Sequence, residues 1–290
     1  MIYYLPTIHS TQNGYESLAE LAKATSNLRA SRLELNMSRV SFFDANMAAQ
    51  LGAVLASVAD RFNAIEIVNV SSPIENVLRK NEFLTQYRFN PLEDANSTTI
   101  PFRRLQPSEG GLFEEYLQRH LQGKGIPRMS QGLGKLFKQK IFEIFQNAAA
   151  HAGSDLGVFV CGQFFPQKQK LDLTISDAGI GIRENVRRYF NDPKINSAPA
   201  IRWALKEGNT TKTGNQPGGL GLKLLQDFAR LNKGRIHIIS RFGFYEFDAG
   251  KESFCKMAGD FLGTSVTIEV NTADTTSYCL ASEVPGEGIF

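Results

Sequence analysis

A carboxylate, an amide and an imidazole recur every four residues in one short segment of the chain. The segment EIFQNAAAHA (143–152) carries Glu143, Asn147 and His151. Positions four apart on a helix are offset by only about 40°, so neighbours in this series project the same way. Carboxylate and amide oxygens suit Mg²⁺, and a carboxylate beside that ion can activate a water or hydroxyl nucleophile. Taken alone, the strip is equally compatible with polar residues at the edge of a helix.

A second segment places a carboxylate at the end of a strand. In DLTISDAGIGI (172–182) the strand leads to Asp177, and Gly179 and Gly181 then allow close approach to the backbone. A carboxylate fixed there can accept a hydrogen bond from an exocyclic amine such as adenine N6. The alternative is an ordinary turn closed by aspartate and glycine.

Two further segments could contribute to a nucleotide site. QPGGLGLKLLQDFARL (216–231) is a glycine-rich turn that enters a helix, where free amides and the helix dipole suit phosphate oxygens. It is neither a Walker A loop, since no GK[ST] follows, nor a Rossmann fingerprint, since no strand directly precedes it. GTSVTIEV (263–270) begins a strand whose Thr264 hydroxyl could support a nucleotide base, or it is simply the start of a strand.

The order of these four segments resembles the GHKL superfamily of ATP-binding domains, over residues 110–270. EIFQNAAAHA resembles the N box, DAGIGI the first glycine box, GGLGL the second, and GTSVTI the closing strand. The glutamate four residues before the asparagine, with His-Ala following, is most similar to the anti-sigma-factor serine kinases. A sensor histidine kinase would need H-E-x-x-x-P around its phosphoacceptor, and neither His9 nor His120 has that setting.

The resemblance implies ATP and Mg²⁺ as cofactors and assigns a role to each matching residue. Glu143 would be the general base, Asn147 the Mg²⁺ ligand and Asp177 the residue that recognises adenine. The residues implied to shape the base pocket or contact phosphates are Gly179, Gly181, Gly219, Leu220, Gly221, Leu222 and Thr264. NTTKTGNQP (209–217) matches a lid over the nucleotide, from which Lys212 would reach phosphates.

Hydrophobic periodicity predicts a mixed α/β chain with two parts. In the first ninety residues we expect helices at 15–28, 42–62 and 72–84, the second with Asp44 as a cap, and strands at 32–38 and 64–70. Residues 90–110 lose periodicity and indicate a boundary. Beyond it we expect helices at 111–122, 130–151 and 219–232, a hairpin turned at 166–169, and strands at 235–240, 242–247 and 264–270. This pattern is typical of a two-layer α+β sandwich.

The N-terminal part resembles a STAS domain, the fold of anti-sigma-factor antagonists. The resemblance lies in LNMSRVSFFDANMAAQLGAVL (35–55) and the segment that follows it. Where that family has Asp-Ser-Ser-Gly with a phosphorylated serine, this chain has Asp44-Ala45-Asn46-Met47, so Asn46 stands at the acceptor position. An unrelated small α/β domain is the alternative. We therefore expect a STAS-like domain (1–90), a linker (91–110), a GHKL domain (111–270) and a polar tail (271–290).

Composition limits the classes of function. A net charge of +3 with scattered basic residues disfavours a nucleic-acid role. Cys161, Cys255 and Cys279 match no metal or redox spacing, and no apolar stretch approaches the roughly 18 residues of a membrane span. We expect a cytoplasmic bacterial signalling protein with a STAS-type or sigma-factor-like protein partner, compatible with a homodimer, and with no membrane role. It is either a protein serine/threonine kinase or an ATP-gated interaction module with little turnover.

Overall fold

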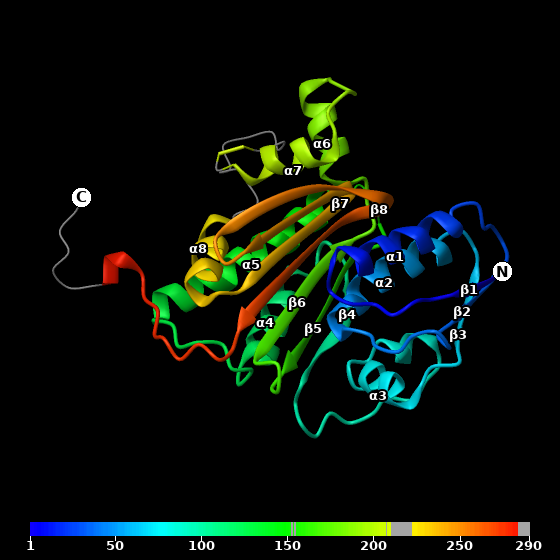
Figure 1. Ribbon diagram of the computed structural model, residues 1–290, viewed down its shortest axis with the longest axis horizontal. Coiled ribbons are helices and arrows are strands. Elements are labelled where there is room, and N and C mark those ends of the chain that lie inside the picture. The colour runs from blue at the N-terminus through cyan, green and yellow to red at the C-terminus, as the bar shows by residue number, and fades with distance from the viewer. Residues whose placement is uncertain (152, 154, 207, 210–221, 284–290) are drawn as a thin grey trace.

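Two β-sheets with helices between and beside them make up the chain (Figure 1). The computed structural model describes residues 1–151, 153, 155–206, 208–209 and 222–283. The fold is mixed α/β, as the periodicity predicts, with one parallel and one antiparallel sheet.

The N-terminal part contains a three-stranded parallel sheet in the order β1-β2-β3. Its elements are β1 (Ile2–Tyr4), α1 (Gln12–Ala24), β2 (Arg32–Asn36), η1 (Ala45–Met47), α2 (Ala48–Ala59), β3 (Ala64–Val68), α3 (Ser72–Lys80) and η2 (Leu84–Tyr87). The predicted alternation of helices and strands is confirmed, and β1 was not predicted. Asp44 does not cap a helix through its side chain; Oδ2 instead accepts a hydrogen bond from the amide of Ser10 at 2.9 Å.

The second sheet has five strands in the order β4-β5-β6-β8-β7, and every neighbouring pair is antiparallel. The strands are β4 (Thr99–Leu105), β5 (Val158–Phe165), β6 (Lys170–Asp177), β7 (Arg235–Asp248) and β8 (Lys251–Asn271). The hairpin of β5 and β6 is confirmed. Treating 91–110 as a linker was wrong for 99–105, because β4 pairs with β5 there. The two strands expected at 235–240 and 242–247 are one strand, β7.

One face of the five-stranded sheet is covered by α4 (Gly110–Leu121), α5 (Gln131–His151) and α8 (Leu222–Asn232). Phe113 of α4 stacks on Phe145 of α5 with ring centroids 4.5 Å apart, and both rings are fully buried. Part of the expected polar tail (271–290) also packs on this layer, since Tyr278 contacts Phe228 of α8. Two short helices, α6 (Gly181–Phe190) and α7 (Ser197–Leu205), were not predicted from the sequence.

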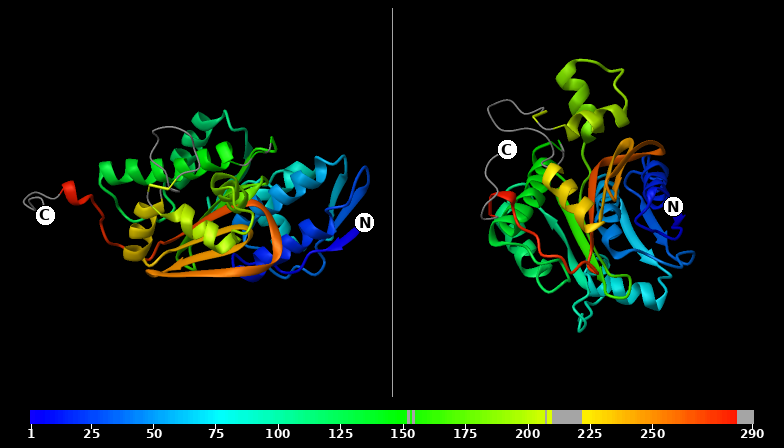
Figure 2. Two further views of the ribbon diagram at one scale, coloured as in Figure 1. Left: turned by 90° about the horizontal axis from the view of Figure 1, so that it is seen from above. Right: turned by 60° about the vertical axis from the view of Figure 1, so that its left-hand side comes forward.

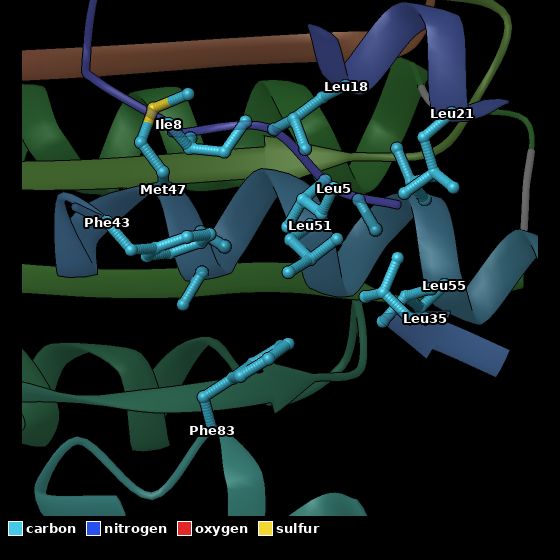
Figure 3. Close-up of a cluster of buried hydrophobic side chains, with 14 of the residues drawn as sticks. Leu5, Ile8, Leu18, Leu21, Leu35, Phe43, Met47, Leu51, Leu55 and Phe83 are labelled. Carbon is cyan, nitrogen blue, oxygen red and sulfur yellow. The ribbon is translucent and has the colours of Figure 1, made fainter. Parts of the chain in front are cut away.

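The other face of the five-stranded sheet is covered by α1 and α2, which therefore lie between the two sheets. Figure 2 shows the N-terminal part against this face. Figure 3 shows the contact layer, in which Leu18 and Leu21 of α1 and Leu51 and Leu55 of α2 pack with Leu35 of β2. The same buried cluster continues into Phe159 of the large sheet.

Small residues allow these layers to approach closely. A Cβ on Gly52 of α2 would lie 2.6 Å from the Phe102 ring of β4, and one on Gly259 of β8 would lie 2.7 Å from Ala19 of α1. Real Cβ atoms do not approach other atoms so closely, so glycine is required at both contacts. The N-terminal part is thus built into the core of the large sheet.

Candidate functional site

Asp177 is the predicted site residue whose pKa departs most from its ordinary value. It ends β6 with 3% of its surface exposed, and Oδ1 accepts a hydrogen bond from the amide of Gly179 at 2.8 Å. Burial raises the pKa of this carboxyl to about 7, although backbone hydrogen bonds from Gly179 and Thr264 oppose the shift. A ligand that donates an N–H to the carboxylate would favour its ionised form.

Two glycines allow the backbone to pack closely around this carboxyl. Gly263 has a φ of +74°, and a Cβ there would lie 2.2 Å from the carbonyl oxygen of Asp177 and 2.5 Å from its Oδ1. Gly181 has a φ of +79°, and a Cβ there would lie 2.8 Å from the hydroxyl of Ser240. Both positions require glycine for conformation and for space. The register between β7 and β8 also shifts beside them, between Ser240 and Gly243.

Ser240 joins the three elements that meet at this point, and sequence reasoning missed it. Its hydroxyl donates to the carbonyl of Gly263 at 3.0 Å and accepts from the amide of Ile182 at 2.8 Å. It also lies 3.0 Å from the hydroxyl of Thr264. Nothing in the sequence around Ser240 distinguishes it from any other serine.

The chain just after helix α5 lies beside the loop that follows Asp177. The helix packs against β6 through buried residues such as Ile144, and just beyond its end a Cβ on Gly153 would lie 3.7 Å from Ile180, in the loop after Asp177. Glu143 and Asn147 are half-buried on successive turns of α5. Both carboxylate oxygens of Glu143 contact the ammonium of Lys140, at 2.9 and 3.0 Å.

The structure describes only some of the remaining predicted site residues. Leu222 is buried in the core at the start of α8, so its side chain is not available to a ligand. Gly219, Leu220, Gly221 and Lys212 lie outside the described residues, as does the side chain of His151. Of the residues predicted to contact phosphates directly, the structure thus describes only Leu222.

The side chains present fit a magnesium-nucleotide better than a metal ion alone. Within the described part of the chain, no group of three or more His, Cys, Asp or Glu side chains could hold a metal. Asn147 and Glu143 supply two oxygen-bearing side chains from one helix. Mg²⁺ is commonly held by one or two carboxylates together with phosphates and water, so a bound nucleotide would complete such a site.

Asn46, at the position of the STAS phosphoacceptor, is fully buried between the layers. Its amide nitrogen donates to the hydroxyl of Ser10 at 3.2 Å and to that of Thr174 on β6 at 3.1 Å. Asn46 therefore faces the chain's own large sheet, against which α2 packs.

No family model matches the chain, and no match was found among curated proteins. None of the helices in the described residues is both long and apolar enough to cross a membrane.

Proposed function

We propose that this chain binds ATP with Mg²⁺ as a signalling protein of the GHKL type with a fused STAS-like part, and that it acts as a protein serine/threonine kinase in partner switching. The observation that carries the proposal is Asp177. A buried, strand-terminal carboxyl with a raised pKa, bordered by Gly181 and Gly263, is arranged to accept an amine. The proposed family rests on the order of the four motifs in the sequence.

Each residue then has one task. Asp177 would accept an N–H from the adenine amine. Asn147 on the α5 strip would offer its amide oxygen to a Mg²⁺ ion that binds the phosphates. Bound ATP supplies the phosphoryl group to be transferred. Glu143 orients the attacking hydroxyl and accepts its proton, and for this its carboxylate must first separate from the ammonium of Lys140.

The ion pair of Glu143 with Lys140 favours a second candidate, an ATP-gated interaction module. In this pair both carboxylate oxygens of Glu143 are taken up by the ammonium of Lys140, so they are not free to contact a hydroxyl nucleophile. A chain that keeps this pair when nucleotide is bound would change conformation with little turnover. Single-turnover measurements with ATP-Mg²⁺ and a STAS-type protein separate the two candidates, because only the kinase transfers phosphate.

The test of the nucleotide site uses the full chain and calorimetric titration with ATP-Mg²⁺. Asp177→Ala should abolish binding. The matched control is Asp172→Asn, since Asp172 lies on the same strand, is equally buried and also has a pKa raised to about 7. Asp172 faces the opposite side of the sheet, as the strand alternation requires. Loss of binding in both variants, or no binding by the unaltered protein, would reject the proposal.

A further inference from the structure

The hairpin of helices α6 and α7, defined as residues 181–206, projects from the edge of the large sheet beside β7 (Figures 1 and 2). One side of the hairpin is anchored: a Cβ on Gly243 of β7 would lie 2.6 Å from Ile201 and 2.9 Å from Ser197. Arg187 also closes the connection between the helices by donating to the carbonyl of Ile195 at 2.8 Å. The hairpin is therefore held in place on one side, while Tyr189 and Phe190 on it are exposed.

Three aromatic side chains gather on this hairpin. Tyr189 is 55% and Phe190 49% exposed, and Trp203 is half-buried beneath them. The ring centroids of this aromatic cluster are 5.0 Å apart for Tyr189 and Phe190, 5.4 Å for Tyr189 and Trp203, and 5.3 Å for Phe190 and Trp203. Single exposed apolar residues are ordinary, but a contiguous exposed group marks a contact surface.

The same hairpin carries the excess positive charge of the protein. Its six basic side chains and two acidic ones give it a net charge of +4, whereas the whole chain has +3. Four of the basic side chains are exposed: Arg188, Lys194, Arg202 and Lys206. Only Arg188 is in an ion pair with another described residue, Glu184, at 3.3 Å.

We infer that the α6–α7 hairpin binds the surface of a membrane that contains anionic lipids. Tyrosine and tryptophan favour the boundary between headgroups and acyl chains, because each ring has an apolar body and a polar group. Each basic residue near an anionic surface strengthens binding roughly fivefold. A pair of helices that projects from the sheet can approach a flat surface. Association of this kind is peripheral and differs from our expectation of no membrane role.

The test uses the full chain with vesicles of phosphatidylcholine, either pure or with about one third phosphatidylserine. Trp203 is the only tryptophan in the sequence, so its fluorescence reports on the aromatic cluster directly. We expect flotation with the anionic vesicles and a blue shift of the emission, both weakened by added salt. The neutral vesicles should bind at least tenfold more weakly. No flotation with anionic vesicles would reject the inference.

Paired variants separate the two contributions while keeping Trp203 as the reporter. Replacing Tyr189 and Phe190 by serine should weaken binding about tenfold, and Arg188→Glu with Lys194→Glu should weaken it more than tenfold. The matched control is Phe62→Ser, because Phe62 is 88% exposed but lies after α2, outside the hairpin. Each variant must keep the melting temperature of the parent protein.

Two other results would overturn the inference. Equal loss of binding in Phe62→Ser would show that general surface hydrophobicity attaches the protein to lipid. A fluorescence shift with soluble polyglutamate and none with vesicles would assign the hairpin to an acidic protein partner. Neither result depends on nucleotide binding, so the proposals for the hairpin and for Asp177 are tested separately.

Discussion

Replacing Asp177 by asparagine should change how the stability of the protein depends on pH. The carboxyl has an ordinary pKa of 3.8 and a folded-state pKa of about 7, because it is buried. Between these values the folded state binds more protons than the unfolded state, so stability falls as pH rises. From pH 5 to pH 8 this one group should lower the free energy of unfolding by about 2.5 kcal/mol.

Asparagine keeps the shape of the side chain and removes the titration. Its carbonyl oxygen can still accept from the amide of Gly179, and any hydrogen bond lost to Thr264 is an offset that does not vary with pH. The assay is urea denaturation of both proteins at about pH 5 and pH 8. Other titrating groups, including Asp172, contribute equally to both proteins and cancel in the difference.

The expected result is that the parent protein loses about 2.5 kcal/mol more stability over this range than Asp177→Asn does. Parallel losses in the two proteins would refute the reasoning, because Asp177 would then not titrate in this range. If adenine binds as proposed, the affinity of the parent protein for ATP should also rise as pH increases towards 7. The ionised carboxylate is the form that accepts an N–H.

Three further predictions follow from the site and its supporting layer. Glu143→Ala should keep most ATP binding and lose phosphate transfer, since the carboxylate acts mainly in the transition state; equal loss of both in calorimetry and single-turnover assays would contradict its assigned role. Gly263→Ala should lower the free energy of unfolding by about 1–3 kcal/mol in a denaturant titration, because of its positive φ and the close Asp177 backbone; an unchanged midpoint would argue against the close packing of Gly263 on Asp177. Incubation with ATP-Mg²⁺ followed by peptide mass mapping should leave exposed Ser38 and Ser41 unmodified; stoichiometric phosphate there, absent in Glu143→Ala, would make the chain its own substrate.

The hydrophobic pattern predicted most elements because their periodicity is strong. Helix α5 and the hairpin of β5 and β6 were placed within one or two residues. Strand β4 was missed because Pro101, Arg103 and Arg104 interrupt its apolar pattern. Its position is fixed by pairing with β5, which lies more than fifty residues away. Such long-range pairing leaves no local signal.

Residue types and spacing determined which groups can do chemistry in this protein. They gave the α5 strip of Glu143 and Asn147, and the strand end that carries Asp177. Only the tertiary structure decided that the Asp177 carboxyl is buried, since its burial depends on the approach of β8 and Gly263 from far along the chain. It also decided that Asn46 faces the large sheet, because the packing of α2 between two sheets is set by complementary surfaces rather than by its own sequence.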